Sequence, residues 1–329
     1  IDPLNSAPRV LKLILVILFI FEISRIFNKY KYYTLRYIFK TWFIIFLTIS
    51  VDIIIELLLG SNILGFSTTL DGRIASFFGD ELVVGSYYYG FALLSISYLI
   101  KQNANFFILS TAILIIVIIS FLIGERSSFV KLFISILIFS SLALNIHLVK
   151  KILLLSIFGG FVIIFLSLNE SYKYRYIDQI KKIYSIGGIS FFLNDTAYGK
   201  HYGVAKKIYN EYPIFGVGVK NFRLESFSPK YSPDGNWTGG STHPHQIHYE
   251  FLSETGLFGY TSFLIFLLGS LYLSLKSYFK NKNVYQLSGI LFVFSTLIPL
   301  LPSGSFLTTF FSSIFWLNFA LMISFSKLK

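Results

Sequence analysis

The sequence predicts an all-α membrane protein, a polytopic bundle of transmembrane helices, from its composition, its apolar runs and its charge distribution. Of its 329 residues, 54% are hydrophobic and 13% are charged, and the mean hydropathy is +0.68. In an ordinary soluble protein, about a quarter of all residues are charged. The apolar residues form Leu/Ile/Phe blocks rather than the alternating pattern of a membrane barrel, so the spanning backbone is expected to be helical.

About nine segments are long and apolar enough to be candidate spans, because a helix needs about 20 residues to cross a bilayer. They lie at about 10–24, 38–59, 83–100, 104–123, 129–147, 152–168, 253–275, 284–301 and 305–325. The long connection after the sixth span divides the chain into three expected parts. These are N-terminal transmembrane helices over 1–168, a large periplasmic loop over 169–252 and C-terminal transmembrane helices over 253–329.

The orientation follows from the Lys and Arg residues, which are concentrated in every second connection. Of those in the short connections, most lie at 25–40, 101, 150–151, 276–282 and 327–329, and these connections are expected to face the cytoplasm. The alternate connections hold few, so the N-terminus is predicted outside and the C-terminus inside. Because topology accounts for most of the net charge of +12, the basic composition gives no reason to expect a nucleic-acid partner, and the lipid bilayer is the expected surrounding.

Features that the chain lacks exclude or disfavour several kinds of site and several classes of protein. It begins at Ile1 without the charged n-region and cleavage site of a signal peptide, so we expect further spans upstream. The absence of Cys excludes disulfides, thiolate metal sites and cysteine nucleophiles. No internal repeat is visible, which argues against repeat-built transporters.

Asp52 and Glu56 within a span could form a functional pair, or could pair with a neighbouring Arg or lie near the outer boundary.

The long loop is predicted to contain an amphipathic helix. Asn194-Asp195-Thr196 resembles an N-cap and Pro213 would end the helix. One face carries residues spaced by three and four: Tyr198, Tyr202, Ala205, Tyr209 and Tyr212. With lysines on the opposite face, such a helix suits the membrane interface. The following Gly216-Val217-Gly218 lacks the remaining residues of a dinucleotide or phosphate-loop motif, so no nucleotide cofactor is expected.

The most informative segment is the histidine-rich run that precedes the seventh span. It holds His243, His245 and His248 close together at a predicted membrane boundary. A histidine placed there could take a proton from a sugar hydroxyl as the hydroxyl attacks an anomeric carbon. Two alternatives remain open: a zinc site of three imidazoles, although the spacing differs from a helical His-x-x-x-His pair, and a structural role as hydrogen-bonding residues at the interface.

Two linked motifs carry a family resemblance. The run from His243 to Tyr260, together with residues 212–222 (Tyr-Pro-Ile-Phe-Gly-Val-Gly-Val-Lys-Asn-Phe), resembles the C-terminal signature of the O-antigen ligase and O-antigen polymerase superfamily. That signature reads roughly Pro-hydrophobic-hydrophobic-Gly-x-Gly-x-x-Asn-Phe, then His-x-His-Asn and Leu-x-Glu-x-Gly-hydrophobic-hydrophobic-Gly. Residues 72–81 and 124–127 are also similar to upstream outer-loop motifs of the family, so the similarity covers most of the chain.

The resemblance implies an inverting, metal-independent glycosyltransferase without a cofactor, in the bacterial inner (cytoplasmic) membrane with its active site facing the periplasm. The donor would be an undecaprenyl-diphosphate-linked glycan. The acceptor would be a hydroxyl of lipid A core or of a growing glycan, in the biosynthesis of lipopolysaccharide or another surface polysaccharide. An O-antigen ligase-like activity is the first expectation. A repeat-unit polymerase of the same superfamily is the alternative, and a lipid-linked glycan flippase or transporter is a more distant one.

The resemblance also assigns roles to individual residues. His245 matches the second His of the family motif and would activate the acceptor, and Arg126 matches the outer-loop Arg that would hold the diphosphate. A further family Arg is expected near the start of the loop helix, where this chain has Lys200 and His201 instead. A Lys offers a point charge without the planar fork of Arg.

The remaining candidates surround these two residues. Arg73 and Arg223 are further candidate contacts of the diphosphate, and either could anchor lipid headgroups instead. His243, Gln246 and His248 are expected to support His245, with Gln246 in place of the usual Asn. No metal ligand is expected from the resemblance.

Overall fold

The computed structural model describes residues 3–30, 32–68, 70–79, 82–144, 147–231, 240–307 and 309–325, and it is helical with no strand among these residues. The long helices are α1 (Pro3–Lys29), α2 (Tyr32–Leu59), α3 (Val84–Lys101), α4 (Phe106–Leu122), α5 (Arg126–Ala143), α6 (Leu148–Leu168), α12 (Ile247–Asn281), α13 (Val284–Thr296) and α14 (Thr309–Ser324). The predicted all-α class is confirmed. Several residues named in the predictions lie outside the described part of the chain: Ile1, Asp80, Glu81, Lys327 and Lys329.

Each of the nine predicted spans coincides with one of these long helices. The helices α1, α2 and α12 extend beyond the predicted spans, whereas those around the last connection are shorter: α13 ends at Thr296 instead of continuing to 301, and α14 begins at Thr309 instead of 305. Pro299 and Pro302 explain the early end, because proline has no backbone N–H and does not fit a helix interior.

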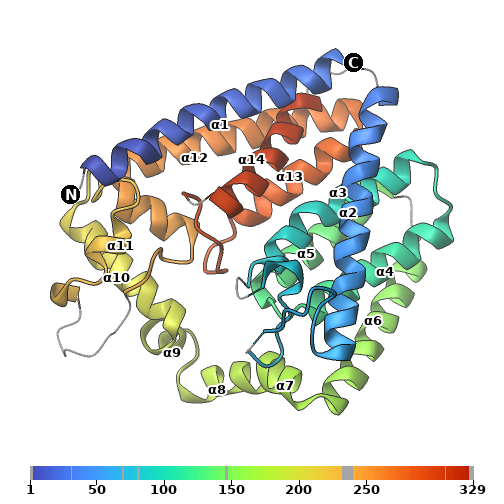
Figure 1. Cartoon of the computed structure of the whole chain (residues 1–329), viewed down its shortest axis with the longest axis horizontal. Coiled ribbons are helices and arrows are strands. Elements are labelled where there is room, and N and C mark those ends of the chain that lie inside the picture. The colour runs from blue at the N-terminus through green and yellow to red at the C-terminus, as the bar shows by residue number, and fades with distance from the viewer. Residues whose placement is uncertain are drawn as a thin grey trace.

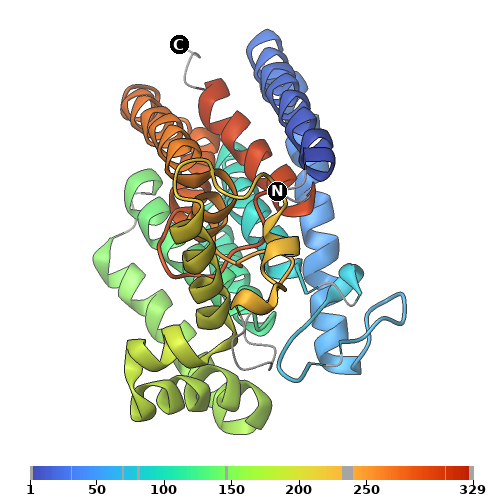
Figure 2. The ribbon, with the colours of Figure 1, turned by 90° about the vertical axis from the view of Figure 1, so that its left-hand side faces the viewer.

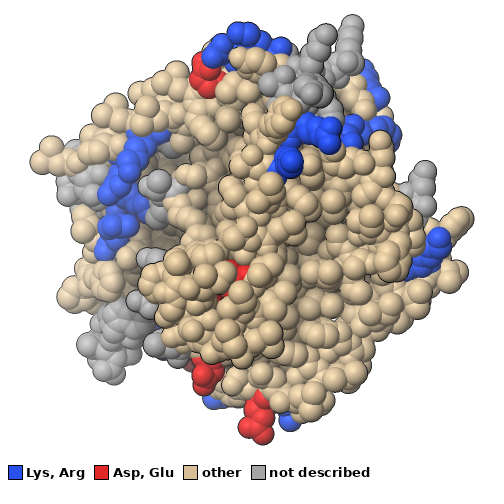
Figure 3. All heavy atoms as spheres, turned by 45° about the vertical axis from the view of Figure 1, so that its right-hand side comes forward, with Lys and Arg blue, Asp and Glu red and all other residues tan. Residues whose placement is uncertain are grey.

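Much of the surface is apolar, as expected of helices that face lipid. Four helices among the described residues are long and apolar enough to cross a membrane: Leu35–Leu59, Arg126–Ala143, Leu148–Leu168 and Ile247–Asn281. Shorter apolar helices are Phe106–Leu122, Val284–Thr296 and Phe310–Ser324. Figure 3 shows a broad, mostly uncharged face with a small acidic spot near its middle and basic side chains gathered in separate groups towards its margins. The number of spans and their orientation stay predictions.

The core is formed by the helices α2, α3, α4, α5, α12, α13 and α14. Gly289 of α13 permits a close helix crossing, because a Cβ there would lie 2.5 Å from the carbonyl oxygen of Asn318 on α14. Small residues at such crossings and hydrogen bonds between helices are typical of membrane bundles. One such bond joins the Ser97 and Ser288 hydroxyls at 2.7 Å.

A group of short elements connects α6 to α12: α7 (Glu170–Lys173), a π-helix (Tyr174–Asp178), α8 (Gln179–Ile186), α9 (Gly188–Asp195), α10 (Ala197–Glu211) and α11 (Phe222–Glu225). Figures 1 and 2 show these elements at the same end of the bundle as the connection between α2 and α3. We call this the loop end of the bundle, where α2, α4, α6 and α13 terminate and α3, α5, α12 and α14 begin.

The predicted amphipathic helix is α10. Thr196 caps it, since its hydroxyl accepts a hydrogen bond from the Gly199 N–H at 3.2 Å, and the helix ends just before Pro213. Part of the helix face that carries the spaced tyrosines packs against protein rather than the membrane interface. Tyr202 is buried and its ring stacks on Tyr249 of α12 with 4.8 Å between centroids. The helix α10 therefore lies against the start of α12, which directly follows His243 and His245.

Candidate functional site

The two linked sequence motifs form one structural unit. The Gly216 turn lies on the backbone of α12, and a Cβ at Gly216 would lie 2.4 Å from the carbonyl carbon of Glu254. Gly256, with φ 64°, interrupts α12, and a Cβ there would lie 2.4 Å from the Ile214 oxygen. Backbone hydrogen bonds join the motifs: Val217 N to Ser253 O, Gly218 N to Glu254 O, Leu257 N to Pro213 O and Phe258 N to Ile214 O. Both glycines are required by this backbone contact.

A buried group of charges lies beneath this unit and was not identified from the sequence. The backbone N–H of Lys220 donates to Glu254 Oε2 at 2.5 Å, and its Nζ donates to the Ser305 hydroxyl at 2.9 Å. Ser305 in turn donates to Glu250, which also accepts from the Phe306 N–H at 2.7 Å. Burial lowers the pKa of Lys220, whereas the two carboxylates oppose this shift. Buried charges need such partners. Of these residues, Glu254 alone matches the family motif, as its Glu.

His245 has an unusual backbone conformation that its neighbours hold in place. Its φ is 58°, in the left-handed region that non-glycine residues rarely adopt. Its carbonyl oxygen accepts from the Ser303 N–H at 2.7 Å. The adjacent Pro302 carbonyl accepts from Lys131 Nζ of α5 at 2.8 Å. The connection between α13 and α14, which is itself bound to Glu250, thus orients the predicted base. Residues held in rarely populated backbone conformations, as His245 is, are common at active sites.

Three imidazoles meet at this position, which we call the histidine group: His201, His243 and His245. The rings of His243 and His245 are 3.9 Å apart, and those of His201 and His245 are 5.2 Å apart. His201 comes from α10, so the position where the family Arg was expected does face His245. The predicted supporter His248 points elsewhere, because it bonds the Leu297 oxygen at 2.9 Å and the Tyr260 hydroxyl at 3.0 Å.

Gln246 has a structural place at the start of α12. Its side-chain oxygen accepts from the N–H groups of His248 at 2.7 Å and Tyr249 at 3.2 Å, which makes it the N-cap of the helix. An amide or carboxylate oxygen at this position satisfies N–H groups that have no partner within the helix. The Asn of the family motif would supply the same kind of oxygen.

Two members of the histidine group, His243 and His245, are uncharged at neutral pH. Burial, together with the neighbouring His201, lowers the pKa of His245 to about 4. Burial lowers the pKa of His243 to about 3, assisted by His245, Lys220, His201 and Arg223. A neutral imidazole can accept a proton, so His245 is present in the form that a general base requires.

The two outer-loop motifs pack against each other at the loop end. A Cβ at Gly124 would lie 1.9 Å from the Gly72 oxygen, and the Ile74 N–H donates to the Ile123 oxygen at 3.1 Å. Asp52 and Glu56 hold the first motif from below. Glu56 accepts from the Ala75 and Ser76 N–H groups at 3.1 and 2.6 Å, and Asp52 accepts from the Ser76 hydroxyl at 2.5 Å. The acidic pair is thus a structural support for the segment that carries Arg73.

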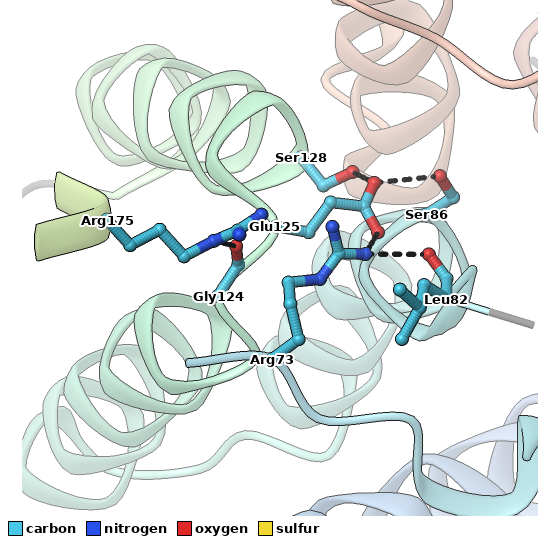
Figure 4. A network of polar contacts seen from close by, with 7 residues as sticks. All are labelled: Arg73, Leu82, Ser86, Gly124, Glu125, Ser128 and Arg175. Carbon is cyan, nitrogen blue, oxygen red and sulfur yellow. Dashed lines mark hydrogen bonds and ion pairs between the residues drawn. The ribbon is translucent and has the colours of Figure 1, made fainter. Parts of the chain in front are cut away.

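Three half-buried arginines, Arg73, Arg126 and Arg175, meet above this contact, and we call them the arginine group. Arg73 donates to the Leu82 oxygen at 2.8 Å and lies 3.6 Å from Glu125 (Figure 4). Arg126 donates to the Arg175 backbone oxygen at 2.9 Å. Arg175 donates through Nε to the Gly124 oxygen at 2.6 Å. Arg175 was not predicted from the sequence, because no motif surrounds it.

Tyr198 of α10 links the histidine group to the arginine group. Its ring centroid is 5.6 Å from that of His245. It also lies near enough to Arg126 and Arg175 to influence the pKa of both guanidiniums. The candidate base and two of the three arginines therefore lie around one tyrosine.

The other predicted contacts occupy different places. Arg223 of α11 lies within charge range of Lys220 and His243, on the histidine side of the site. Lys200 is half-buried on α10, and among the described residues the structure shows no contact of its side chain with either group. Within the same part of the chain, no three His, Asp or Glu side chains are arranged to hold a metal ion.

Comparison with known families agrees with this geometry. The model of the family described as O-antigen ligase matches residues 110–264, which include Arg126, Arg175 and the histidine group. The resemblance predicted from the sequence is thereby confirmed. A search of the curated proteins found no match. The family match and the apolar helices together indicate a multi-pass membrane enzyme of polysaccharide biosynthesis.

Proposed function

We propose that this chain, which belongs to the O-antigen ligase superfamily, is an inverting, metal-independent glycosyltransferase. It would move a glycan from undecaprenyl diphosphate to an acceptor hydroxyl at the periplasmic face of the inner membrane. The observation that carries the proposal is the position of neutral His245 beside the arginine group, across Tyr198. A base next to several cations suits a transfer in which the acceptor loses a proton while a diphosphate departs.

The reaction would proceed by one displacement. The acceptor oxygen attacks the anomeric carbon from the side opposite the diphosphate, and the bond between that carbon and the diphosphate oxygen breaks. The imidazole of His245 takes the hydroxyl proton as the new bond forms. The hydrogen bond between Ser303 and the His245 carbonyl fixes the backbone from which this imidazole projects, so little reorganisation is needed in the transition state.

The arginine group would stabilise the negative charge that develops on the departing diphosphate. Guanidinium groups bind phosphate oxygens through paired hydrogen bonds and keep their charge at any relevant pH. Arg73 and Arg126 are already oriented by the Leu82 and Arg175 oxygens. On the other side, Arg223 lies near His243, where it could contact an anionic group of either substrate.

The identity of the acceptor distinguishes the two activities that are expected for this superfamily, ligase and polymerase. A ligase-like enzyme would use lipid A core, and a repeat-unit polymerase would use a growing glycan with the same donor. Offering both acceptors with one labelled donor distinguishes them, since only the accepted hydroxyl yields a labelled product. A transporter would relocate the donor without forming a new glycosidic bond.

The proposal is tested with the full-length protein in lipid nanodiscs, a prenyl-diphosphate-linked glycan and each acceptor. We expect His245→Ala and Arg126→Ala to lose at least about 100-fold in transfer rate, because base and charge stabilisation each contribute on this scale. Lys206→Ala is the matched control, since this side chain is exposed on α10. A chelator should have no effect. Retention of activity in His245→Ala would remove the proposed base, and loss on chelation would reopen the zinc alternative.

A further inference from the structure

We propose that Arg175 binds the diphosphate of the donor directly and gives the site its preference for a diphosphate over a monophosphate carrier. This inference rests on the proposed function, and it names a residue that neither the sequence motifs nor the expected family pattern assigned. It is carried by the placement of Arg175, by the contacts of its guanidinium and by the charge balance of the arginine group.

Arg175 lies in a π-helix, Tyr174–Asp178, that is fixed firmly to the end of α4. Tyr176 donates to the Phe121 oxygen at 2.8 Å, and Tyr172 donates to the Leu122 oxygen. The Tyr176 ring also packs on Phe121, with 4.5 Å between centroids. Single π-helical turns are rare and occur often at functional sites, because they turn a side chain out of the regular helical spacing. Here the turn aims an arginine at the loop end.

The guanidinium is held by one of its donors and presents the others. Its Nε donates to the Gly124 oxygen at 2.6 Å. Figure 4 shows the side chain extending across Gly124 towards Arg73 and Glu125. A guanidinium has five N–H donors, so this bond orients the planar fork without using its Nη groups. A fork fixed in this way can bind two phosphate oxygens at once.

The charge balance of the group points to an anion with more than one charge. Burial, together with repulsion by Arg73 and Arg126, lowers the pKa of Arg175 to about 10. Among the described residues, Glu125 is the carboxylate that forms an ion pair with the group, through Arg73. Three guanidiniums are therefore balanced by one carboxylate. Because the remaining positive charges repel one another in a half-buried place, a bound anion is favoured there. A glycan-diphosphate-prenyl diester carries one negative charge on each phosphate, which matches the excess.

The two roles of Arg175 can be separated by mutation. Its backbone oxygen accepts the hydrogen bond from Arg126 Nη1 at 2.9 Å, and this contact survives truncation of the side chain. A change at Arg175 therefore removes one guanidinium while the backbone contact that orients Arg126 remains. The exposed Lys173, two residues earlier in the same segment, is a matched control for a change in local charge.

The experiment measures donor KM, kcat and direct binding of prenyl diphosphate and prenyl monophosphate by the full-length protein in nanodiscs. We expect Arg175→Ala to raise the donor KM and the Kd of prenyl diphosphate by about 10- to 100-fold, which is the usual loss for a charge-assisted pair. Monophosphate binding should change less, so the preference for diphosphate falls. Arg175→Lys should recover part of the loss, because it restores charge without the fork. Lys173→Ala should match wild type.

Two outcomes would overturn the inference. One is unchanged binding of prenyl diphosphate in both Arg175 variants, even where Arg126→Ala and His245→Ala abolish transfer, and that result would leave the proposed function intact. The other is an equal loss of diphosphate and monophosphate binding, which would reduce Arg175 to a general contribution of charge. If the wild type catalyses no transfer, the proposed function fails, and the binding arms still test Arg175. Arg175→Gln, which can still donate to Gly124, controls for a folding defect.

Discussion

The lowered pKa of His245 predicts an unusual pH dependence of transfer. An ordinary histidine has a pKa near 6.5, whereas burial and the neighbouring His201 lower that of His245 to about 4. A general base works in its neutral form, so kcat/KM should fall only as the pH approaches about 4. At pH 5.5 an ordinary histidine would be neutral in about 9% of molecules, and one with a pKa of 4 in about 97%. The free enzyme is thus expected to keep nearly full kcat/KM at pH 5.5, instead of losing about tenfold.

The variant His201→Phe isolates the charge contribution to this shift. It keeps a buried ring beside His245 but removes a group whose positive charge disfavours protonation of His245. Its loss should therefore raise the pKa of His245 and move the acid limb of kcat/KM to higher pH. The assay follows kcat/KM for the donor between pH 4 and pH 8, where the diphosphate diester does not titrate, with Lys206→Ala as control. A wild-type acid limb near pH 6.5, or no upward movement in His201→Phe, would refute this reasoning.

Three further predictions concern the residues around the site. Gly256→Ala should lower stability by about 1–3 kcal/mol or more, because the position has φ 64° and no space for a Cβ; Gly269→Ala in the same helix, with open space around it, should leave the melting temperature unchanged or raise it slightly. Lys220→Met should cost about 3–5 kcal/mol by leaving buried carboxylates unpaired, whereas Lys206→Met should be neutral in the same thermal unfolding measurement. Tyr198→Phe should reduce transfer without changing the melting temperature, and an unchanged rate would exclude its hydroxyl from the reaction.

The fold was predictable from the sequence where local signals dominate. Apolar blocks located the long helices, and Thr196 with Pro213 located α10. The interruption of α12 at Gly256 was not predictable, because it depends on contact with Ile214 in a distant segment. Glycine inside an apolar run is common in membrane helices, so its presence gave no sign that the helix is broken there.

The candidate site was less predictable because its members meet only in the folded chain. His248 is near His245 in sequence, yet α12 begins at Ile247, and the first helical turn directs His248 to Leu297 instead. His201 takes its place because α10 packs on α12. Arg175 has no surrounding motif, and its position follows from tyrosine contacts with the end of α4.

The buried acidic residues of the spans are better explained by positioning than by proton transfer. Four non-glycine residues at the loop end have positive φ angles: Ser76, Lys220, His245 and Leu300. Each is fixed by a buried or half-buried partner, since Ser76 bonds Asp52 and Glu56, Lys220 bonds Glu254, His245 bonds Ser303 and Leu300 bonds Tyr202. Strained backbone persists only where its surroundings determine it. Carboxylates within apolar helices therefore stabilise the loop conformations that bring Arg73, Lys220 and His245 into place, and this arrangement offsets the energetic cost of burying them.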